Sequence, residues 1–324
     1  MTAWRLRAAS AAAAVVVDHL VGDPTDRLHP VAWFGRAMTR REARAWGDHR
    51  LSGARHLGAG VAAATVPVIA LGAVARRTGG VAGAGAFSIA VVATTLGARS
   101  LDRRACEIGE ALARGRVEDA RLLLPGLVGR DPAGLDEAEI ARAVVESVAE
   151  NTVDAVVAPL LWAALGGPVA AAAYRAVNTL DAMVGYRNDR YRHFGWASAR
   201  ADDFANFVPA RVAAALVALC SPPHVRGIVR AVRRQAPGHP SPNAGVVEAA
   251  FAGALGLRLG GTNRYGGVVE HRVELGDGRA PTAGDIVRSR LLARRVTLVT
   301  AAALAVPFLW DLRRSPALPH RGAS

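Results

Sequence analysis

The stretch that decides the fold is ESVAENTVDAVVAPLLWAALGGPVAAAAY, residues 146–174. It opens with three acidic residues spaced four apart and continues with 20 residues that carry no charge, 155–174. A helix needs ~20 apolar residues to cross the hydrocarbon core of a bilayer. Gly166, Gly167 and Pro168 interrupt the run near its middle, and membranes tolerate such a break where the chain lines a cavity. The stretch therefore predicts a broken or re-entrant pair of half-helices that starts at an acidic site.

Three further uncharged runs predict a membrane protein. Residues 57–75 and 78–98 contain 19 and 21 residues without a charge, and 296–310 contains 15. Shorter apolar runs at 8–17 and 212–223 fit membrane helices and buried core helices equally well. Strand patterns are almost absent. We expect an all-α, polytopic integral membrane protein with about four to six membrane-embedded helices and helical cytoplasmic segments. Residues 1–312 should form one domain, followed by a polar C-terminal tail, 313–324.

The distribution of positive charge favours a membrane over nucleic acid. A net charge of +13 would ordinarily suggest a nucleic-acid partner. We expect none, because the arginines flank the apolar runs, as the positive-inside rule predicts for cytoplasmic loops. The segment 36–56, with six arginines and two acidic residues, is expected in the cytoplasm. The chain contains no lysine, which excludes a P-loop lysine, a Schiff-base lysine and a Ser-Lys dyad.

The acidic residues at the start of the deciding stretch are candidate metal ligands. Glu146, Glu150 and Asp154 share one helix face, because residues four apart are neighbours on a helix. Only Arg142, one turn earlier, is placed to pair with Glu146. A solvated acidic face is the ordinary alternative, but Asp154 abuts an apolar run, where ionised groups are costly and tend to be functional. Mg²⁺ prefers such oxygen ligands, so the spacing favours a metal site.

A second polar segment, residues 178–190, follows the uncharged run 155–174 and mixes acids, amides and arginines. Asn178 and Asp181 are three residues apart and share a helix face. For single arginines, contact with lipid head groups is an equally good explanation. The mixture favours an anionic ligand together with its metal. The candidates in the loop that follows are Arg187, Asn188 and Arg190.

Three other segments contribute candidates. Asp202 and Asp203 are adjacent, so at most one should face a site while the other serves as an acid near a helix N-terminus. The glycine pairs on either side of TNRY, residues 262–265, predict an anion-binding nest of backbone N–H groups, although an ordinary loop is the alternative. The candidates from these segments and from residues 18–30 are Asp18, Asp23, His29, Asp203, Asn243, Glu248, Gly260 and Gly261.

Five long motifs occur in order along the chain, namely GDP...HPV, ESVAENTVDAVVAPLLWAALGG, YRAVNTLDAMVGYRNDRYRHFG, ARADDFANFVPAR and SPNAGVVEAAFAGALGLRLGG. Taken together, they closely resemble the CobD/CbiB family of cobalamin biosynthesis proteins, the adenosylcobinamide-phosphate synthases. The resemblance spans about residues 12–310 and departs from the family pattern at Ala182, where serine is expected. Arg175 stands where lysine would also fit.

The resemblance implies a multi-pass enzyme of the cell membrane whose active site faces the cytoplasm. Such an enzyme uses ATP and Mg²⁺ to join the carboxylate of adenosylcobyric acid to the amine of (R)-1-amino-2-propanol or its O-phosphate. The catalytic candidates are then Glu150, Asp154, Asp181, Asp203 and Glu248, and the candidate metal ligands are Glu146, Glu150, Asp154 and Asp181. The candidate substrate and ATP contacts are Asp23, His29, Asn151, Asn178, Arg187, Asn188, Arg190, Asn243, Gly260 and Gly261.

Three functions other than this ligase are compatible with the residues themselves. A corrinoid or ion transporter would carry charges inside several spans, whereas the long runs are uncharged. An AmpE-like membrane signalling protein would have degraded acidic motifs, and a different membrane phosphotransferase is set aside only by the family resemblance. The expected partners are the corrinoid, the aminopropanol and the lipid bilayer. A homo-oligomer, or association with other late enzymes of the pathway, is compatible with the sequence.

Overall fold

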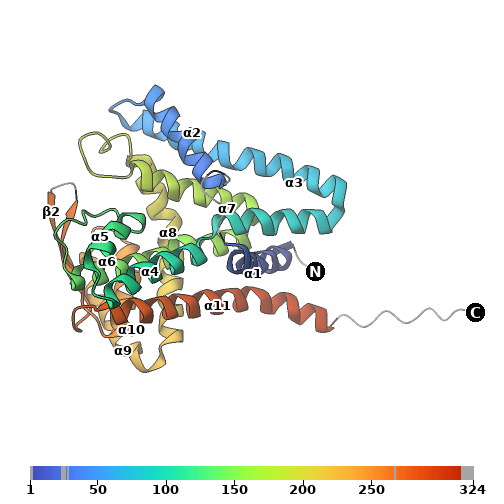
Figure 1. The fold of residues 1–324 in the computed structure, drawn as a ribbon. Coiled ribbons are helices and arrows are strands. Elements are labelled where there is room, and N and C mark those ends of the chain that lie inside the picture. Colours follow the sequence, from blue (N-terminus) through green and yellow to red (C-terminus); the bar gives the residue numbers. More distant parts are fainter. Residues whose placement is uncertain (1–2, 23–26, 28, 266–267, 315–324) are drawn as a thin grey trace, which may run out of the picture.

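The computed structural model describes residues 3–22, 27, 29–265 and 268–314, and it is almost entirely helical (Figure 1). Its longer helices are α1 (Ala3–Val21), α2 (Pro30–Ala45), α3 (Arg50–Thr95), α4 (Ala98–Ala113), α5 (Val117–Leu123), α6 (Glu137–Thr152), α7 (Ala158–Val184), α8 (Trp196–Cys220), α9 (Val225–Arg234), α10 (Ala244–Leu255) and α11 (Ala283–Arg314). Short turns η1 (Leu124–Gly126), η2 (Val153–Val157), η3 (Pro222–His224) and η4 (Ala236–Gly238), and strands β1 (Leu259–Tyr265) and β2 (Val268–Leu275), complete the described elements.

The predicted all-α, polytopic membrane architecture is confirmed. Four helical stretches of the described chain are long and apolar enough to cross a membrane, namely Arg50–Ala113, Glu137–Val184, Trp196–Cys220 and Ala283–Trp310. Figure 1 shows α3 and α11 extending in the same general direction as the arms of α7, while α8 runs across them. The short helices α5, α6, α9 and α10 and the β-hairpin gather at the end of the molecule opposite the C-terminus, on the left in Figure 1.

The helix α3 is a hairpin whose two arms lie side by side. Gly80 has φ 60° and ψ −143°, a conformation that only glycine adopts readily and that reverses the chain between the arms. A Cβ on Gly83 would lie 2.5 Å from the carbonyl oxygen of Ala75, so the arms touch through backbone at this point. The two uncharged runs 57–75 and 78–98 therefore form an antiparallel pair.

The run 155–174 is broken in the same way. Gly167 has φ 71° and ψ −160° directly before Pro168, and the chain turns back on itself there. As a result the hydroxyl of Tyr174 lies 3.5 Å from a carboxylate oxygen of Asp154, although the residues are far apart in sequence. The prediction of a broken, re-entrant pair is confirmed, and it brings the second polar segment next to the first.

Two hydrophobic cores hold these hairpins. One joins α1, the end of α3, α7 and α11 through small residues such as Ala8, Ala11 and Ala163, all nearly fully buried. Small side chains let membrane helices approach closely. The other core surrounds α6 and α10, and both cores contact α6, α7 or the turn between them. The acidic face of α6 is thus fixed from two sides.

The start of α6 and the β-hairpin frame the functional end of the molecule. Asp136 caps α6 by accepting from the backbone N–H of Glu139 at 2.8 Å, and Glu139 accepts from the N–H of Asp136 at 2.9 Å. Such a reciprocal box satisfies the free amides of a helix start. The strands β1 and β2 pair in antiparallel fashion, with Leu259 opposite Leu275, both fully buried. The sequence predicts almost no strands, and this hairpin is an exception. The buried pair Leu259 and Leu275 anchors it, and its strands lack the long alternating pattern by which a strand is recognised in a sequence.

Candidate functional site

A network of polar side chains joins the returning arm of α7 to α8. Asp202 accepts from the side-chain amide of Asn178 at 3.2 Å and from that of Asn206 at 3.1 Å, one at each carboxylate oxygen. The hydroxyl of Tyr174 donates to Asn206 at 2.9 Å and lies near Asp154 of the π-helical turn η2. Tyr174 and Asn206 are almost fully buried. The network therefore fixes the position of Asp202 relative to three elements.

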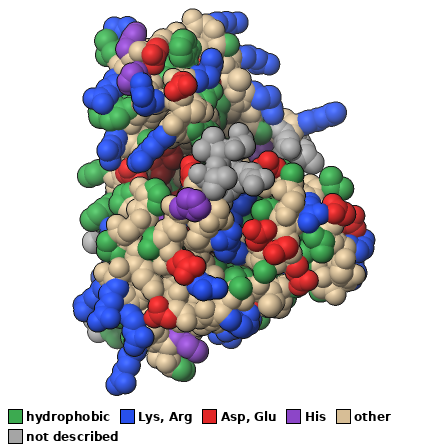
Figure 2. All heavy atoms as spheres, turned by 90° about the vertical axis from the view of Figure 1, so that its left-hand side faces the viewer, with side chains coloured by type: hydrophobic (Ala, Val, Ile, Leu, Met, Phe, Trp, Pro, Cys, Tyr) green, Lys and Arg blue, Asp and Glu red, His purple; other side chains and the backbone are tan. Residues whose placement is uncertain are grey.

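Four carboxylates gather around this network. Asp202 lies within electrostatic reach of Glu150, Asp154 and Asp181. Glu150 is exposed, whereas the other three are half-buried. Figure 2 shows acidic side chains deep in a hollow on the face turned away from the C-terminus, with basic side chains close by. The hollow is thus negatively charged at its base and open to solvent.

The turn that ends α7 lies in close contact with Asp181. The N–H of Gly185 donates to the carbonyl oxygen of Asp181 at 2.7 Å and ends the helix. A Cβ on Gly185 would lie 1.9 Å from a carboxylate oxygen of Asp181. Glycine is required here by this close approach rather than by its backbone angles, because φ is −73°. The carboxylate of Asp181 therefore lies directly against the start of the loop after α7.

Glu146 is a structural anchor beside the hollow. It is buried and forms an ion pair with Arg130, from the loop before α6. Its second oxygen accepts from the backbone N–H of Gly260 at 2.7 Å. The expected pairing with Arg142 is wrong: Arg142 instead donates to the carbonyl oxygens of Gly260 and Thr262, the latter at 2.8 Å. The reason is that β1 passes within reach of Arg142, a contact that sequence spacing does not reveal.

Glu248 faces the same region from α10. It is buried, lies 3.9 Å from the imidazole Nε2 of His239, and experiences the charges of Glu146, Glu150 and Arg272. Burial, and then the neighbouring glutamates, raise the pKa of Glu248 well above its usual value. Burial also lowers the pKa of His239, so the imidazole is neutral at physiological pH. The raised pKa makes the buried carboxyl group of Glu248 a candidate for proton transfer.

The donor chemistry of the hollow fits a magnesium ion, but no single preformed ligand set is present. Carboxylate and amide oxygens are the ligands that Mg²⁺ prefers. Four acids share the hollow, while the nearby cations acting on them are mainly Arg272, Arg130 and Arg175. Within the described ranges, no three carboxylate, histidine or cysteine side chains are close enough to hold one ion. Because Glu146 is already paired, Glu150, Asp154 and Asp181 remain the predicted ligands, and Asp202 joins them.

Two of the predicted contact residues, Arg190 and Asn188, have partners within the protein. Arg190 forms an ion pair with Glu42 at 2.9 Å and covers the ring of Trp46 at 5.1 Å, which ties the loop after α7 to α2. The side chain of Asn188 accepts from the N–H of Tyr191 at 2.9 Å. These contacts place Arg190 and Asn188 in the framework of the loop rather than at the base of the hollow.

The remaining predicted residues are dispersed. His29 caps α2 by accepting from the N–H of Val31 at 3.1 Å, and Asn151 donates to the carbonyl oxygen of Ser147 at 2.9 Å. Asn243 is buried and donates to the carbonyl oxygen of Asp203 at 2.7 Å, which joins α10 to α8. Gly261 (φ 80°) continues the turn at Gly260 (φ 76°), and Arg187 lies within electrostatic reach of Asp203. Asp23 lies outside the described residues.

Four residues of the site were not singled out from the sequence. They are Tyr174, Asp202, Asn206 and Arg272. The candidates predicted from the sequence include Asp203 and not Asp202. Asn206 follows Asp202 by four residues on the same face of α8. That i, i+4 spacing was the available signal for the pair. Arg272 reaches the site from β2, a strand that the sequence pattern does not predict.

Comparison with known proteins gives a consistent result. The family model described as CobD/Cbib protein matches residues 11–293. Cobalamin biosynthesis protein CobD of Mycobacterium tuberculosis is 49% identical over 316 residues, which are 97% of this chain and 98% of that protein. The CobD proteins of Pelobacter propionicus and Halalkalibacterium halodurans are 42% and 40% identical, over 91% and 88% of this chain and 92% and 91% of their own lengths. No solved structure matches this chain significantly.

Proposed function

The chain belongs to the CobD/CbiB family of cobalamin biosynthesis proteins, and from this premise we propose that it is an ATP-dependent acid–amine ligase. Its substrates would be adenosylcobyric acid and (R)-1-amino-2-propanol or the O-phosphate of that amine. The product is adenosylcobinamide or its phosphate. The observation that carries the proposal is the hollow in which Asp202 joins Glu150, Asp154 and Asp181.

The reaction requires activation of a carboxylate, because a carboxylate does not acylate an amine at neutral pH. In the proposed course, a carboxylate oxygen of adenosylcobyric acid accepts the γ-phosphoryl group of ATP, and ADP leaves. The amine nitrogen then attacks the acyl carbon and loses a proton, and the phosphate departs with the oxygen that was phosphorylated. Catalysis of such a phosphoryl transfer is largely positioning and charge neutralisation.

The residues of the hollow suit these tasks. Bound Mg²⁺ would neutralise phosphate charge, and its candidate ligands are Glu150, Asp154, Asp181 and Asp202. Arg272, which acts on both Glu150 and Glu248, supplies a fixed positive charge toward a phosphate. Glu248 is our choice for the acceptor of the amine proton, because it lies close to Glu150 and its raised pKa makes its carboxylate a stronger base. Asp203 is the second candidate for that role.

A cytoplasmic location for the hollow follows from the charge distribution. The arginine-rich segment 36–56 forms α2 and the start of α3, and Arg190 ties the loop after α7 to α2 through Glu42. The positive-inside rule assigns such arginine-rich segments to the cytoplasm. We therefore infer that the hollow opens toward the cytoplasm from the cell membrane, where ATP is available.

The direct test is product formation by the purified protein in detergent. The assay would contain adenosylcobyric acid, aminopropanol phosphate, ATP and Mg²⁺, and would compare the wild type with Glu150→Gln. Asp277→Asn, in the exposed turn after β2, is the control. Amide and ADP from the wild type and the control, but not from Glu150→Gln, would support the proposal. Corrinoid binding without any product from the wild type would contradict it and favour a transporter.

A further inference from the structure

A second cavity lies behind the acidic site, between α1, α4, α6 and α11. Its volume is about 580 Å³, within the range of small-molecule binding sites. Val148, Thr152 and Val156 form part of its wall. These residues are two positions out of step with Glu150 and Asp154, which places them on the opposite side of the same helical segment. The cavity is therefore separate from the hollow but shares a helix with it.

Positive charge dominates the lining of this cavity. Its charged lining residues are Arg99, Arg103, Arg290, Arg294, Asp18 and Asp102. Four arginines against two aspartates leave an excess of two positive charges, and the N-terminus of α4 at Ala98 adds a partial positive charge. An anion is the ligand that this charge distribution favours.

Two of the arginines are available for such an anion. Arg290 is neutralised by Asp102 through two hydrogen bonds of 2.8 Å. Arg294 makes no hydrogen bond or ion pair with the described residues, and it is exposed. Arg103 has only a contact of 3.9 Å with Glu107, in which both side chains are more than half exposed. Arg103 and Arg294 are thus free to bind a ligand at the mouth of the cavity.

The cavity lies at the edge of the apolar part of the molecule. Arg294 is followed, after one further arginine, by the uncharged run 296–310 of α11. Arg99 directly follows the uncharged run 78–98. Val15 and Leu298 supply apolar lining next to the arginines. Arginines at the ends of membrane helices lie at the depth of lipid phosphates, and basic pockets between such helices bind anionic head groups.

We propose that this cavity binds an anionic phospholipid. The phosphate would contact Arg103 and Arg294, and the glycerol and first acyl carbons would lie along Val15 and Leu298. The shared chemistry is a phosphate group, which a soluble phosphate compound could also supply. The apolar lining and the position at the membrane boundary favour the lipid. Because the bound lipid would contact Val156 in the turn η2, it would also stabilise the segment that carries Asp154.

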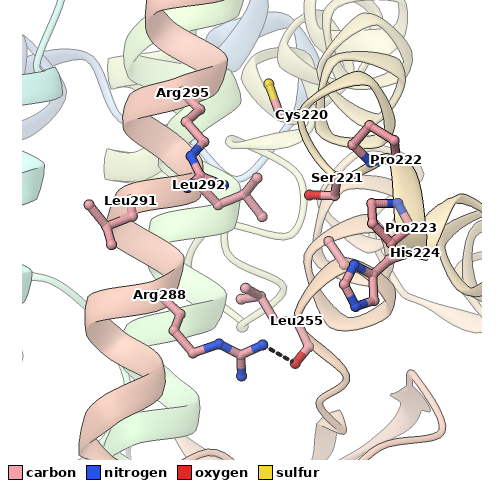
Figure 3. A pocket seen from close by; sticks show the side chains of 11 residues that line it. Cys220, Ser221, Pro222, Pro223, His224, Leu255, Arg288, Leu291, Leu292 and Arg295 are labelled. Carbon is pink, nitrogen blue, oxygen red and sulfur yellow. Dashed lines mark hydrogen bonds between the residues drawn. The ribbon is translucent and has the colours of Figure 1, made fainter.

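A pocket on the other side of α11 provides the matched control. It has a volume of about 460 Å³ and is lined by Arg288 and Arg295 (Figure 3). Arg288 is occupied by the carbonyl oxygen of Leu255 at 2.8 Å and by Asp285 at 2.7 Å. Arg295 neighbours Arg294 in sequence but lines this other pocket. Replacing Arg295 removes the same charge at the same depth without altering the proposed lipid site.

The test measures lipid binding, so it does not depend on the proposed reaction. Native mass spectrometry and thermal unfolding of the full chain in detergent would be recorded with phosphatidylglycerol, phosphatidylcholine or inorganic phosphate. The wild type, Arg295→Gln, Arg294→Gln and the double variant Arg103→Gln/Arg294→Gln would be compared. We expect phosphatidylglycerol to bind and to raise the unfolding temperature in the wild type and in Arg295→Gln. Affinity should fall roughly 5-fold in the single variant and roughly 25-fold in the double variant.

Three results would overturn the proposal. One is equal binding of phosphatidylcholine and phosphatidylglycerol by the wild type. Another is an equal loss of affinity in Arg295→Gln and Arg294→Gln, which would indicate general surface charge rather than this cavity. The third is full stabilisation by inorganic phosphate with no further effect of the lipid, which would assign the site to a soluble phosphate. If the double variant does not fold, the exposed single variant Arg294→Gln decides between these results.

Discussion

Asn178 and Asp202 are joined by a hydrogen bond of 3.2 Å, and this contact links the returning arm of α7 to α8 at the base of the acidic hollow. The contact exists because the chain reverses at Gly167, which carries Asn178 back to the level of Asp154. A helix that continued straight through residue 167 would carry Asn178 to the far side of the membrane. The break in α7 therefore assembles the candidate site.

Asp202 should be required for activity. Asp202→Asn keeps the shape of the side chain but removes the charge that two amide donors position. We expect ligase activity to fall about 100-fold or more, the size typical of a lost electrostatic contact in an active site. Asp277→Asn, in the exposed turn after β2, is the control and should lose less than about 10-fold. Equal losses in both variants would contradict the assignment of Asp202 to the site.

Glu146 should contribute mainly to the free energy of unfolding, through its buried ion pair with Arg130. Glu146→Gln leaves the buried guanidinium of Arg130 without its counter-charge. Breaking such a buried pair costs about 3–5 kcal/mol. Glu110→Gln removes a partner of Arg114 from a pair of 2.9 Å in which both side chains are more than half exposed, and it should cost less than about 1 kcal/mol. Thermal unfolding in detergent checks both values, and a comparable loss in the two variants would show that the Glu146 anchor is unimportant.

Gly185 should be intolerant of any side chain. The Cβ of Gly185→Ala would meet the carboxylate of Asp181, and the displaced carboxylate should lower activity roughly 10- to 100-fold, because small misplacements of catalytic groups are costly. Gly58→Ala is the control, since its Cβ meets no atom within 4 Å. Kinetic assays together with a check of folding by gel filtration decide the matter. Normal activity in Gly185→Ala would show that the position of Asp181 is not critical.

Glu248 should impose a pH-dependent loss of stability. Its pKa is raised in the folded protein, so the unfolded chain releases this proton at lower pH, from about the ordinary value of 4.5 upward. Stability therefore falls as pH rises from there to the folded pKa, and the loss is complete above it. Glu248→Gln has no such proton, so its unfolding temperature should exceed that of the wild type by a margin that is small near about pH 4 and larger near about pH 8.

The same variant separates stability from function. If Glu248 accepts the amine proton, Glu248→Gln should be more stable at neutral pH and yet less active. A margin in unfolding temperature that is constant or shrinks with rising pH would contradict the raised pKa. Full activity in the more stable variant would instead assign proton transfer to another group, with Asp203 as the next candidate.

Much of the fold could be predicted from local sequence. The uncharged runs gave the membrane helices, and the Gly167-Pro168 pair gave the re-entrant turn, because both features depend on neighbouring residues. The α6 cap at Asp136 is equally local. The β-hairpin was not predicted, since the buried pair Leu259 and Leu275 that anchors it is a long-range contact.

The candidate site could be predicted only in part, for a similar reason. Helical periodicity placed Glu150 and Asp154 on one face, but it did not show that Glu146 meets Arg130 from a separate loop. The choice between Asp202 and its neighbour depends on the rotation of α8 against α7, which sequence does not encode locally. The ion pair of Arg190 with Glu42 is not visible in the sequence, because Glu42 lies on a distant helix.

The most direct test of the proposed reaction is to trace one oxygen atom from the substrate carboxylate into inorganic phosphate. Adenosylcobyric acid labelled with ¹⁸O in its reacting carboxylate would be incubated with aminopropanol phosphate, ATP and Mg²⁺, and the inorganic phosphate would be analysed by mass spectrometry. With both carboxylate oxygens labelled, we predict one ¹⁸O atom per phosphate from the wild type, together with amide and ADP, and product formation slower by about 100-fold or more from Asp202→Asn. Unlabelled phosphate released alongside amide would contradict activation as an acyl phosphate, and labelled phosphate from Asp202→Asn at the wild-type rate would contradict the site.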